Sequence, residues 1–386
     1  MRKSWMVLAG CLFVLTLLIG LFFAFSDSFG QTSENDMDQK DFLEDKKAAV
    51  YFSTTADQDM DGKGKSFAVF FDKMGTPNTF EMKGLELGSI GVKDGKVLLE
   101  DKENFYSIAN GFRKIRKEEY QHTGDHIGYL DQKNGFYALY NSGYDKESGG
   151  YRSDYYWEED GEFKKGVIPF FIEASVMHKG TLYTLSSSED EKTYKISEVK
   201  IGEETPPKTL FEIKKNENST TFGQLQADEK NLYFIRQTGN ITEMVKVDRK
   251  TGEKTFTKAA SYSNDEETLY KQTPFSFKRC VFLHNEDLYF IDGFGDVYRI
   301  QTGSGESVKV FSLSEDSMAG SLETFYRDGN LYVFSINHED NSAKIEQYSL
   351  PEGRKSGEML IKHFPELNTF NKKVYLYDFV MLQDLK

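Results

Sequence analysis

The residues best suited to chemistry begin with three aspartates at alternate positions. Asp57, Asp59 and Asp61 precede Gly62 in the series DQDMDG. This matches the first half of a calcium-binding loop, where carboxylates converge because glycine permits a sharp turn. The second half departs from the pattern, since Ala68 stands where a bidentate glutamate is expected. Two interpretations remain open: a weak Ca²⁺ site, which is the one cofactor the sequence suggests, and a solvated acidic hairpin tip.

A second candidate site is a dense aromatic stretch among glycines and charges, GYDKESGGYRSDYYWEEDGEF. Tyrosine and tryptophan offer a large contact area at low entropic cost, so such a stretch suits stacking on sugar rings or anchoring a protein partner. The alternative is core packing, because the last three aromatic residues alternate as they would on a strand packed between sheets. The candidate ligand-binding residues are Tyr144, Tyr151, Tyr155, Tyr156 and Trp157.

Catalytic patterns are otherwise scarce. No G-x-S-x-G motif occurs, which removes the usual signature of a serine hydrolase. His122 and His126 are four residues apart, but the glycines around them are typical of a loop. Cys280 lies in an alternating stretch and is expected to be a buried, small apolar residue. The sequence therefore nominates no catalytic residue.

Composition narrows the classes of partner. The chain has 386 residues, with 48 Lys and Arg against 62 Asp and Glu, a formal net charge of −14. This charge argues against nucleic acid and anionic lipid as partners. Two cysteines are too few for a disulfide scaffold. Abundant aromatic residues (32 Phe and 22 Tyr) with only 7 Pro favour many strands over disorder.

The first 25 residues are predicted to anchor the protein in a membrane. Trp5 to Phe25 carry no charge, and a helix of this length spans a hydrocarbon core of about 30 Å. Arg2 and Lys3 precede the apolar run, so the positive-inside rule predicts a cytoplasmic N-terminus and an extracytoplasmic C-terminal domain on a single-pass signal anchor. The alternatives for this segment are a cleaved signal peptide and lipidation of Cys11.

Residues 26–45 are predicted to be a disordered tether. Their sequence, SDSFGQTSENDMDQKDFLED, contains seven acids, one lysine and few apolar residues. Such a composition does not supply enough apolar surface to offset the entropy of folding. We expect this segment to hold the following domain away from the bilayer without fixing its orientation.

The rest of the chain contains a repeated strand. Its signature is an apolar pair, usually ending in Tyr, which recurs at intervals of 39 to 56 residues and often follows a polar turn. The second residues of the eight copies are Tyr51, Leu98, Tyr137, Tyr183, Tyr233, Tyr289, Tyr332 and Tyr375.

Each period contains four predicted strands, and the clearest copy runs from Leu322 to Ile361. A single unit of this size does not bury both of its faces, so the copies must stack, and radial stacking gives an all-β propeller over residues 46–386. Residues 50–84 supply three strands, and the C-terminal KKVYLYDFVML supplies one more. Together they predict a shared blade and a total of about seven, with six or eight as alternatives.

This layout resembles extracytoplasmic β-propeller domains, particularly those of uncharacterised membrane-anchored proteins from low-cysteine, Gram-positive-like bacteria. The resemblance lies in the repeat alone, because the signatures of WD40, kelch and sialidase repeats are missing, so no family residue is carried over. Propellers host many functions. We expect a non-enzymatic binding or scaffolding module that acts through its loops on an extracytoplasmic protein partner. The alternatives are a module that binds cell-wall carbohydrate and a glycan-active hydrolase or lyase.

Overall fold

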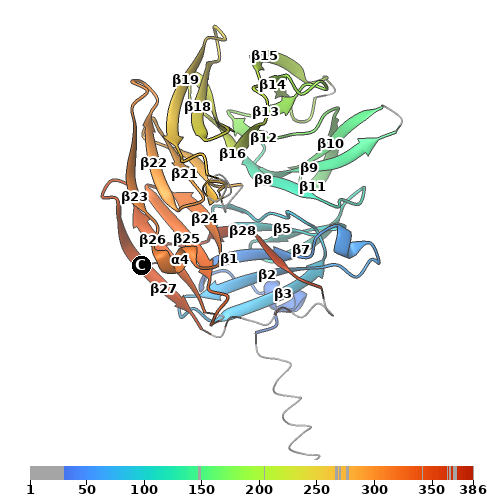
Figure 1. Cartoon of the computed structure of the whole chain (residues 1–386). Helices are drawn as coiled ribbons and strands as arrows, with labels where there is room; N and C mark the ends of the chain where they lie inside the picture. The colour runs from blue at the N-terminus through green and yellow to red at the C-terminus, as the bar shows by residue number, and fades with distance from the viewer. Residues whose placement is uncertain are drawn as a thin grey trace, which may run out of the picture.

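Figure 1 shows the computed structural model of the chain, in which small β-sheets are arranged in a ring. The structure describes residues 30–385 apart from 147–148, 204, 266–267, 269–270, 275–277, 341, 363, 365–366 and 368–371. The strands form seven sheets of four antiparallel strands each. The fold is therefore a seven-bladed β-propeller, as the repeat predicted.

The blades are numbered along the chain, with strands given from the innermost outward. Blade 1 contains β28 (Tyr375–Met381), β1 (Lys46–Ser53), β2 (Lys65–Asp72) and β3 (Pro77–Lys83). Blade 2 contains β4 (Gly91–Lys93), β5 (Lys96–Glu100), β6 (Asn104–Ile108) and β7 (Phe112–Arg116). Blade 3 contains β8 (Gly124–Leu130), β9 (Gly135–Asp145), β10 (Gly150–Glu159) and β11 (Glu162–Ile168).

The remaining blades follow the same order. Blade 4 contains β12 (Ala174–His178), β13 (Thr181–Ser187), β14 (Thr193–Val199) and β15 (Lys208–Lys214). Blade 5 contains β16 (Ser219–Ala227), β17 (Asn231–Thr238), β18 (Ile241–Asp248) and β19 (Lys254–Ser261). Blade 6 contains β20 (Val281–His284), β21 (Asp287–Ile291), β22 (Asp296–Gln301) and β23 (Ser307–Ser312). Blade 7 contains β24 (Ser321–Arg327), β25 (Asn330–Ile336), β26 (Ala343–Ser349) and β27 (Arg354–Ile361).

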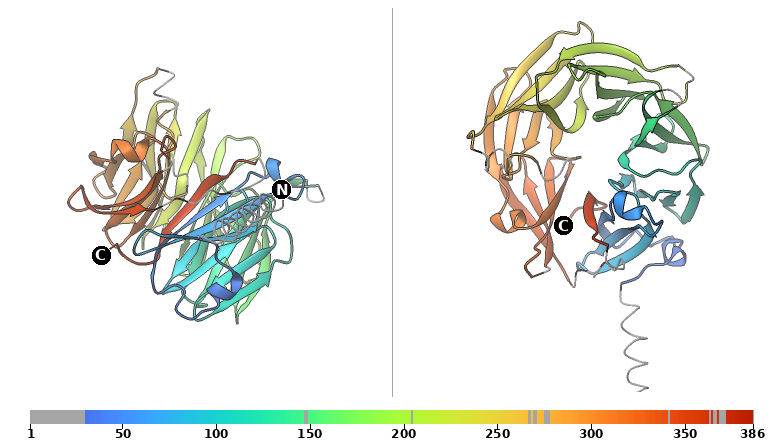
Figure 2. Two further views of the ribbon diagram at one scale, coloured as in Figure 1. Left: turned by 90° about the horizontal axis from the view of Figure 1, so that it is seen from below. Right: turned by 45° about the vertical axis from the view of Figure 1, so that its right-hand side comes forward.

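The ring is closed by strands from both ends of the chain. The C-terminal β28 pairs antiparallel with β1, and Val380 lies opposite Ala49. Figure 2 shows this red strand beside the blue strands of blade 1. Phe379, Val380 and Met381 are fully buried, and each such side chain contributes about 1.5–3 kcal/mol of hydrophobic stabilisation. The predicted shared blade is confirmed, and the eighth copy of the repeat is this closing strand.

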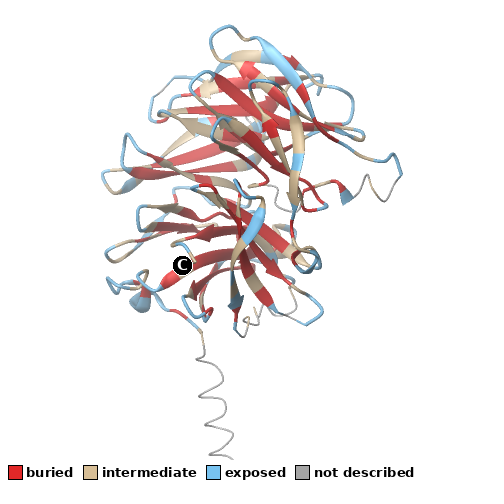
Figure 3. Cartoon of the chain, turned by 90° about the vertical axis from the view of Figure 1, so that its left-hand side faces the viewer, coloured by how far each residue is buried: buried red, intermediate tan, exposed pale blue. Residues whose placement is uncertain are grey.

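The first seven copies of the repeat occupy equivalent positions, because each supplies the second strand of a blade. Their apolar pairs are buried between neighbouring sheets, whereas Tyr375 on the closing strand is 37% exposed. Figure 3 shows burial along the strands and exposure on the turns. The sheets thus bury each other's apolar faces, which is why the repeat requires a closed ring.

The predicted tether is wrong for the part that the structure describes. Residues 30–45 lie on the propeller and include the short helix α2 (Glu34–Met37), which Ser33 caps in a capping box with Asp36. Met37 is fully buried in the hydrophobic core, and Phe42 and Leu43 pack against it. These three apolar residues anchor a segment whose average composition suggested disorder. Residues 26–29 lie outside the described residues.

The predicted membrane anchor, residues 1–25, lies outside the described residues. Within the part that the structure describes, no helix has the length and apolar character needed to cross a membrane. The helices α2 and α4 (Glu315–Met318) and the 3₁₀ turn η1 (Asp57–Asp59) each have no more than four residues.

Candidate functional site

The feature that most distinguishes blade 3 is the extended hairpin formed by β9 and β10. These strands have 11 and 10 residues, more than any other strand in the described parts of the chain. In Figure 1 the green hairpin projects from the ring. A register shift between Arg152 and Ser153 marks a bulge, and Gly143 on the facing strand adopts a φ of 97°. Bulges bend strands and redirect side chains, so the end of the hairpin departs from the regular blade.

Three aromatic side chains near the end of this hairpin form what we term the aromatic patch: Tyr144, Tyr151 and Phe171. Tyr144 and Tyr151 face each other across the strands with ring centroids 5.9 Å apart in an edge-to-face arrangement. Phe171, from the connection between β11 and β12, lies 6.3 Å from Tyr151 in a similar geometry. Their exposed fractions are 61%, 57% and 46%. Clustered, exposed aromatic side chains mark a surface suited to contact with a partner.

The other three candidate aromatic residues belong to the core. Tyr155, Tyr156 and Trp157 are 6%, 1% and 7% exposed. Tyr155 and Trp157 stack at 5.5 Å in a cluster with side chains of blade 4, such as Leu182, whereas Tyr156 packs on Phe105 of blade 2. The alternation predicted for packing between sheets is therefore present. The structure divides the five residues into an exposed pair and a buried trio.

A network of ion pairs, termed here the base network, supports the hairpin beneath the aromatic patch. Arg152 pairs with Asp154 at 2.8 Å and with Glu119 at 2.6 Å, and Lys165 contacts Glu119 at 2.7 Å. Burial alone would raise the pKa of Asp154, but its hydrogen bonds from Arg152 and Gln121 outweigh burial and hold that pKa below its usual value. The network connects the β7–β8 loop to β10 and β11, and so gives the patch a rigid base.

A second cluster of charges lies at the centre of the ring. The innermost strands of a propeller line its central channel. Asp378, on innermost β28, accepts hydrogen bonds from Arg279 Nε at 2.7 Å and from the Ile90 backbone N–H at 2.8 Å. Lys278 donates to the carbonyl of Gly88 at 3.1 Å and to the Ser89 hydroxyl at 2.7 Å. The connection between β19 and β20 therefore bridges to the β3–β4 connection near the channel.

Two further carboxylates in this region differ in their surroundings. Glu100 is buried, contacts Lys117 at 3.3 Å and accepts a hydrogen bond from Tyr140. Asp125, on innermost β8, is buried enough that desolvation raises its pKa to about 6, despite the opposing effect of Lys278. Acids from different blades do converge here, as an enzyme would require, but Glu100 and Asp378 are each paired with a cation. Two of these three carboxylates therefore have their charge offset by a neighbouring cation.

The three aspartates of the candidate calcium loop lie between β1 and β2. Asp59 forms an ion pair with Lys102 at 2.6 Å and accepts a hydrogen bond from the backbone N–H of Gly64. Asp61 forms an ion pair with Lys372. Asp57 is the first residue of the 3₁₀ turn η1. Among the described residues, no group of three or more His, Cys, Asp or Glu is arranged to hold a metal ion. Two of the three carboxylates thus have lysine partners, and the geometry adds no support to the Ca²⁺ hypothesis.

Sequence reasoning missed the base network, the contribution of Phe171 and the charges in the channel. Arg152 and Asp154 carried a usable signal, since residues two apart on a strand share a face. Lys278 and Arg279 carried none, because their partners lie 99 to 191 positions away along the chain. Contacts of this kind depend on closure of the ring.

Comparisons with known proteins agree with this architecture. The chain is 40% identical over 381 residues to the protein YycP of Bacillus subtilis (strain 168), covering 97% of this chain and 98% of that protein. Two solved structures share the fold at low identity: a puromycin hydrolase S511A mutant (TM-score 0.51, 11% identity) and a puromycin-hydrolyzing peptidase of Mycobacterium tuberculosis (TM-score 0.50, 10% identity). These matches cover 82% and 83% of this chain but 52% of each of those chains. The model of the YycP β-propeller domain matches residues 41–382, and the chain belongs to this family.

Proposed function

We propose that this protein is a membrane-anchored, extracytoplasmic binding or scaffolding module that binds a protein partner through the aromatic patch on blade 3. The observation that carries the proposal is the exposure of Tyr144 and Tyr151, on a hairpin held by the base network, and of Phe171 beside them. Rigid aromatic side chains contribute binding energy because little side-chain entropy is lost when they are covered.

The geometry of the patch favours protein over carbohydrate as the ligand. Sugar rings stack on open aromatic faces, but Tyr144 and Tyr151 are nearly perpendicular, at 87°, so the edge of one ring is directed at the face of the other. Trp157, which offers the largest stacking surface in the stretch, is 7% exposed. An edge-to-face cluster instead presents a ridge that fits between side chains of a protein partner.

Site-specific photocrosslinking in intact cells tests the proposal. A benzoylphenylalanine placed at Tyr151 is expected to capture a reproducible protein neighbour. Adding Tyr144→Ser and Phe171→Ser should reduce capture at least tenfold, since loss of a hot-spot side chain costs about 2 kcal/mol or more. The matched control carries the same crosslinker at Phe256, an aromatic residue of blade 5 that is 47% exposed.

Three results would contradict the proposal: no protein product at position 151, equal capture of the same protein from position 256, or crosslinking to wall glycan instead of protein. The substitutions remove exposed side chains, so the variants should keep the unfolding midpoint of the parent within about 1 °C. A larger shift would mean that the patch stabilises the fold.

Membrane anchoring is tested separately. The apolar segment Trp5–Phe25 motivates this part of the proposal. Protease added outside protoplasts should degrade the propeller, and removal of residues 1–25 should leave the protein in the cytosol. Protection of the full chain from external protease would refute the proposed orientation.

A further inference from the structure

A groove runs between the outer strands of blades 1 and 2, on the side of the ring that carries the β1–β2 loop. Its volume is about 580 Å³, which lies in the range of known ligand sites. Residues from the β1–β2 and β5–β6 loops and from β2, β3, β6 and β7 line it. Five of them are cationic: Lys63, Lys65, Lys83, Lys114 and Arg116.

The charge of this groove is opposite to that of the whole chain. Its lining contains two carboxylates, Glu81 and Glu103, so the five cations leave a local charge of 5 − 2 = +3 on a protein of net charge −14. Lys65 pairs with Glu81 at 2.8 Å, and the Lys83–Glu103 pair has a distance of 2.5 Å. These two pairs do not offset the remaining cations.

Two of those cations form no ion pair in the described structure. Neither Lys63 nor Arg116 makes an ion pair with a carboxylate of the described residues, and both side chains are exposed. They come from opposite walls of the groove, Lys63 from blade 1 and Arg116 from blade 2. An anionic ligand in the groove would therefore meet cations on both walls.

The chain's own acidic segment occupies the other end of the same interblade boundary. The outer strands β3 and β7 begin near Thr79 and Phe112, and the groove lies where they end. Where β3 begins, the backbone N–H of Thr32 donates a hydrogen bond to the carbonyl of Thr79 at 2.7 Å. Where β7 begins, the Asp38 carboxylate accepts a hydrogen bond from the backbone N–H of Phe112 at 2.9 Å. Glu34 of α2 reaches Lys114 at 2.9 Å, on the rim of the groove.

We propose that this groove is a binding site for an acidic peptide segment of another protein. The structure already seats an acidic peptide, residues 32–38, at the other end of this interblade boundary, through side-chain carboxylates that contact a lysine and a backbone N–H. The groove offers the same chemistry, with five cations in its lining. The site is on blades 1 and 2 and does not depend on the aromatic patch of blade 3.

Fluorescence anisotropy with labelled decaglutamate tests the site. The full-length chain, kept soluble in a non-ionic detergent, is titrated into the peptide at low salt. Reversing two charges in the K63E/R116E variant should weaken binding at least about tenfold, and raising the salt to about 0.3 M should weaken wild-type binding, because screening shortens the range of exposed charges. K63Q/R116Q should show an intermediate loss.

The matched control is K192E/R354E, which reverses one exposed lysine and one exposed arginine on blades 4 and 7. It changes the net charge of the protein equally and should weaken binding less than about twofold. Absence of binding by the wild type, or equal losses in both reversal variants, would overturn the proposal. If polyphosphate of equal charge competes more strongly than unlabelled decaglutamate, the groove selects phosphate and the peptide assignment is wrong.

Discussion

Replacing Asp378 by asparagine tests whether the buried ion pair at the channel stabilises ring closure. The Asp378 side chain is fully buried on the closing strand and contacts Arg279 twice, at 2.7 and 3.1 Å. It also accepts hydrogen bonds from the backbone N–H groups of Ile90 and Phe379. Asparagine keeps the volume but removes the charge, which leaves Arg279 with no equal counter-charge.

The expected loss is about 3 kcal/mol. Breaking a buried pair by removing one partner costs about 3–5 kcal/mol, and the lower end applies because the Arg279 side chain is 21% exposed and retains some hydration. Unfolding entropy of about 2.1 cal/mol/K per residue over a propeller of roughly 340 residues converts this loss to about 4 °C in the unfolding midpoint.

The effect should depend on pH in a defined direction. Burial would raise the pKa of Asp378, but Arg279 and the neighbouring Lys278 outweigh burial, so the folded-state pKa lies below the usual value of about 3.9. The contribution of this carboxylate is therefore complete above about pH 4 and is lost as the pH falls through the folded-state pKa. The difference in the free energy of unfolding between wild type and D378N should be constant near neutral pH and should decrease below about pH 4.

The assay is urea unfolding of the full-length protein in non-ionic detergent, followed by tyrosine and tryptophan fluorescence. The control is Asp384→Asn, because Asp384 also pairs with an arginine, Arg327 at 2.7 Å, but is 66% exposed. Such a surface pair is worth about 0–1 kcal/mol. Equal effects of D378N and D384N, or a D378N gap that does not change in acid, would refute the reasoning.

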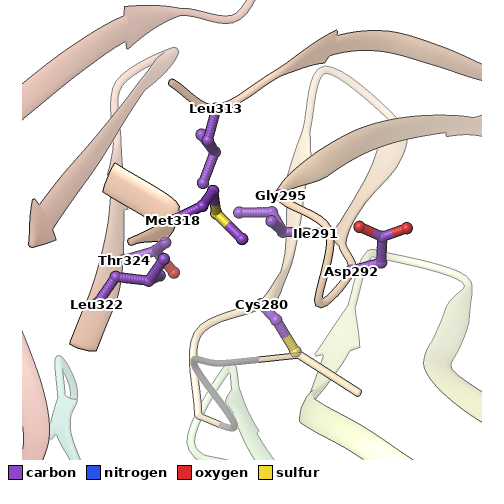
Figure 4. Close-up of a pocket in the computed structure, with 8 residues that line it drawn as sticks. All are labelled: Cys280, Ile291, Asp292, Gly295, Leu313, Met318, Leu322 and Thr324. Atoms are coloured by element: carbon purple, nitrogen blue, oxygen red, sulfur yellow. The ribbon is translucent and has the colours of Figure 1, made fainter. Parts of the chain in front are cut away.

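Three further predictions concern packing and burial. Gly166→Ala should destabilise the fold by about 1–3 kcal/mol, because a Cβ at this position would lie 2.1 Å from Tyr155 Cζ. The control, Gly303→Ala, has open space around the new Cβ and should leave the free energy of unfolding unchanged in the same urea assay. Asp125→Asn should stabilise the fold by about 2 kcal/mol at pH 7 and have no effect near pH 4. The reason is that the pKa of Asp125 is raised to about 6, so its ionisation opposes folding as the pH rises through that value. Urea denaturation at both pH values checks this. Cys280 is 1% exposed and lies beside a cavity of about 10 Å³ (Figure 4), and burial raises the pKa of its thiol. Alkylation of this thiol, mapped by mass spectrometry, should therefore require unfolding. Rapid labelling of the native protein would contradict this.

The sequence alone determined the architecture because a propeller repeats its local pattern. The apolar pair of each second strand, from Tyr51 to Tyr332, lies in a four-stranded unit that must be covered on both faces. The repeat period and the turn residues can both be read from the sequence. The split between strands 50–84 and the C-terminal run also predicted the closure. Local pattern and global fold agree here, so each blade was identifiable on its own.

Only the tertiary structure decided which residues meet across the ring. The burial of Met37, the pairing of Arg279 with Asp378 and the aromatic contact of Phe171 with Tyr151 each join segments whose spacing carries no periodic signal. The same holds for the basic groove, whose cations come from two blades of an acidic chain. Repetition specifies how a blade is built, whereas a site between blades depends on the particular side chains that ring closure places side by side.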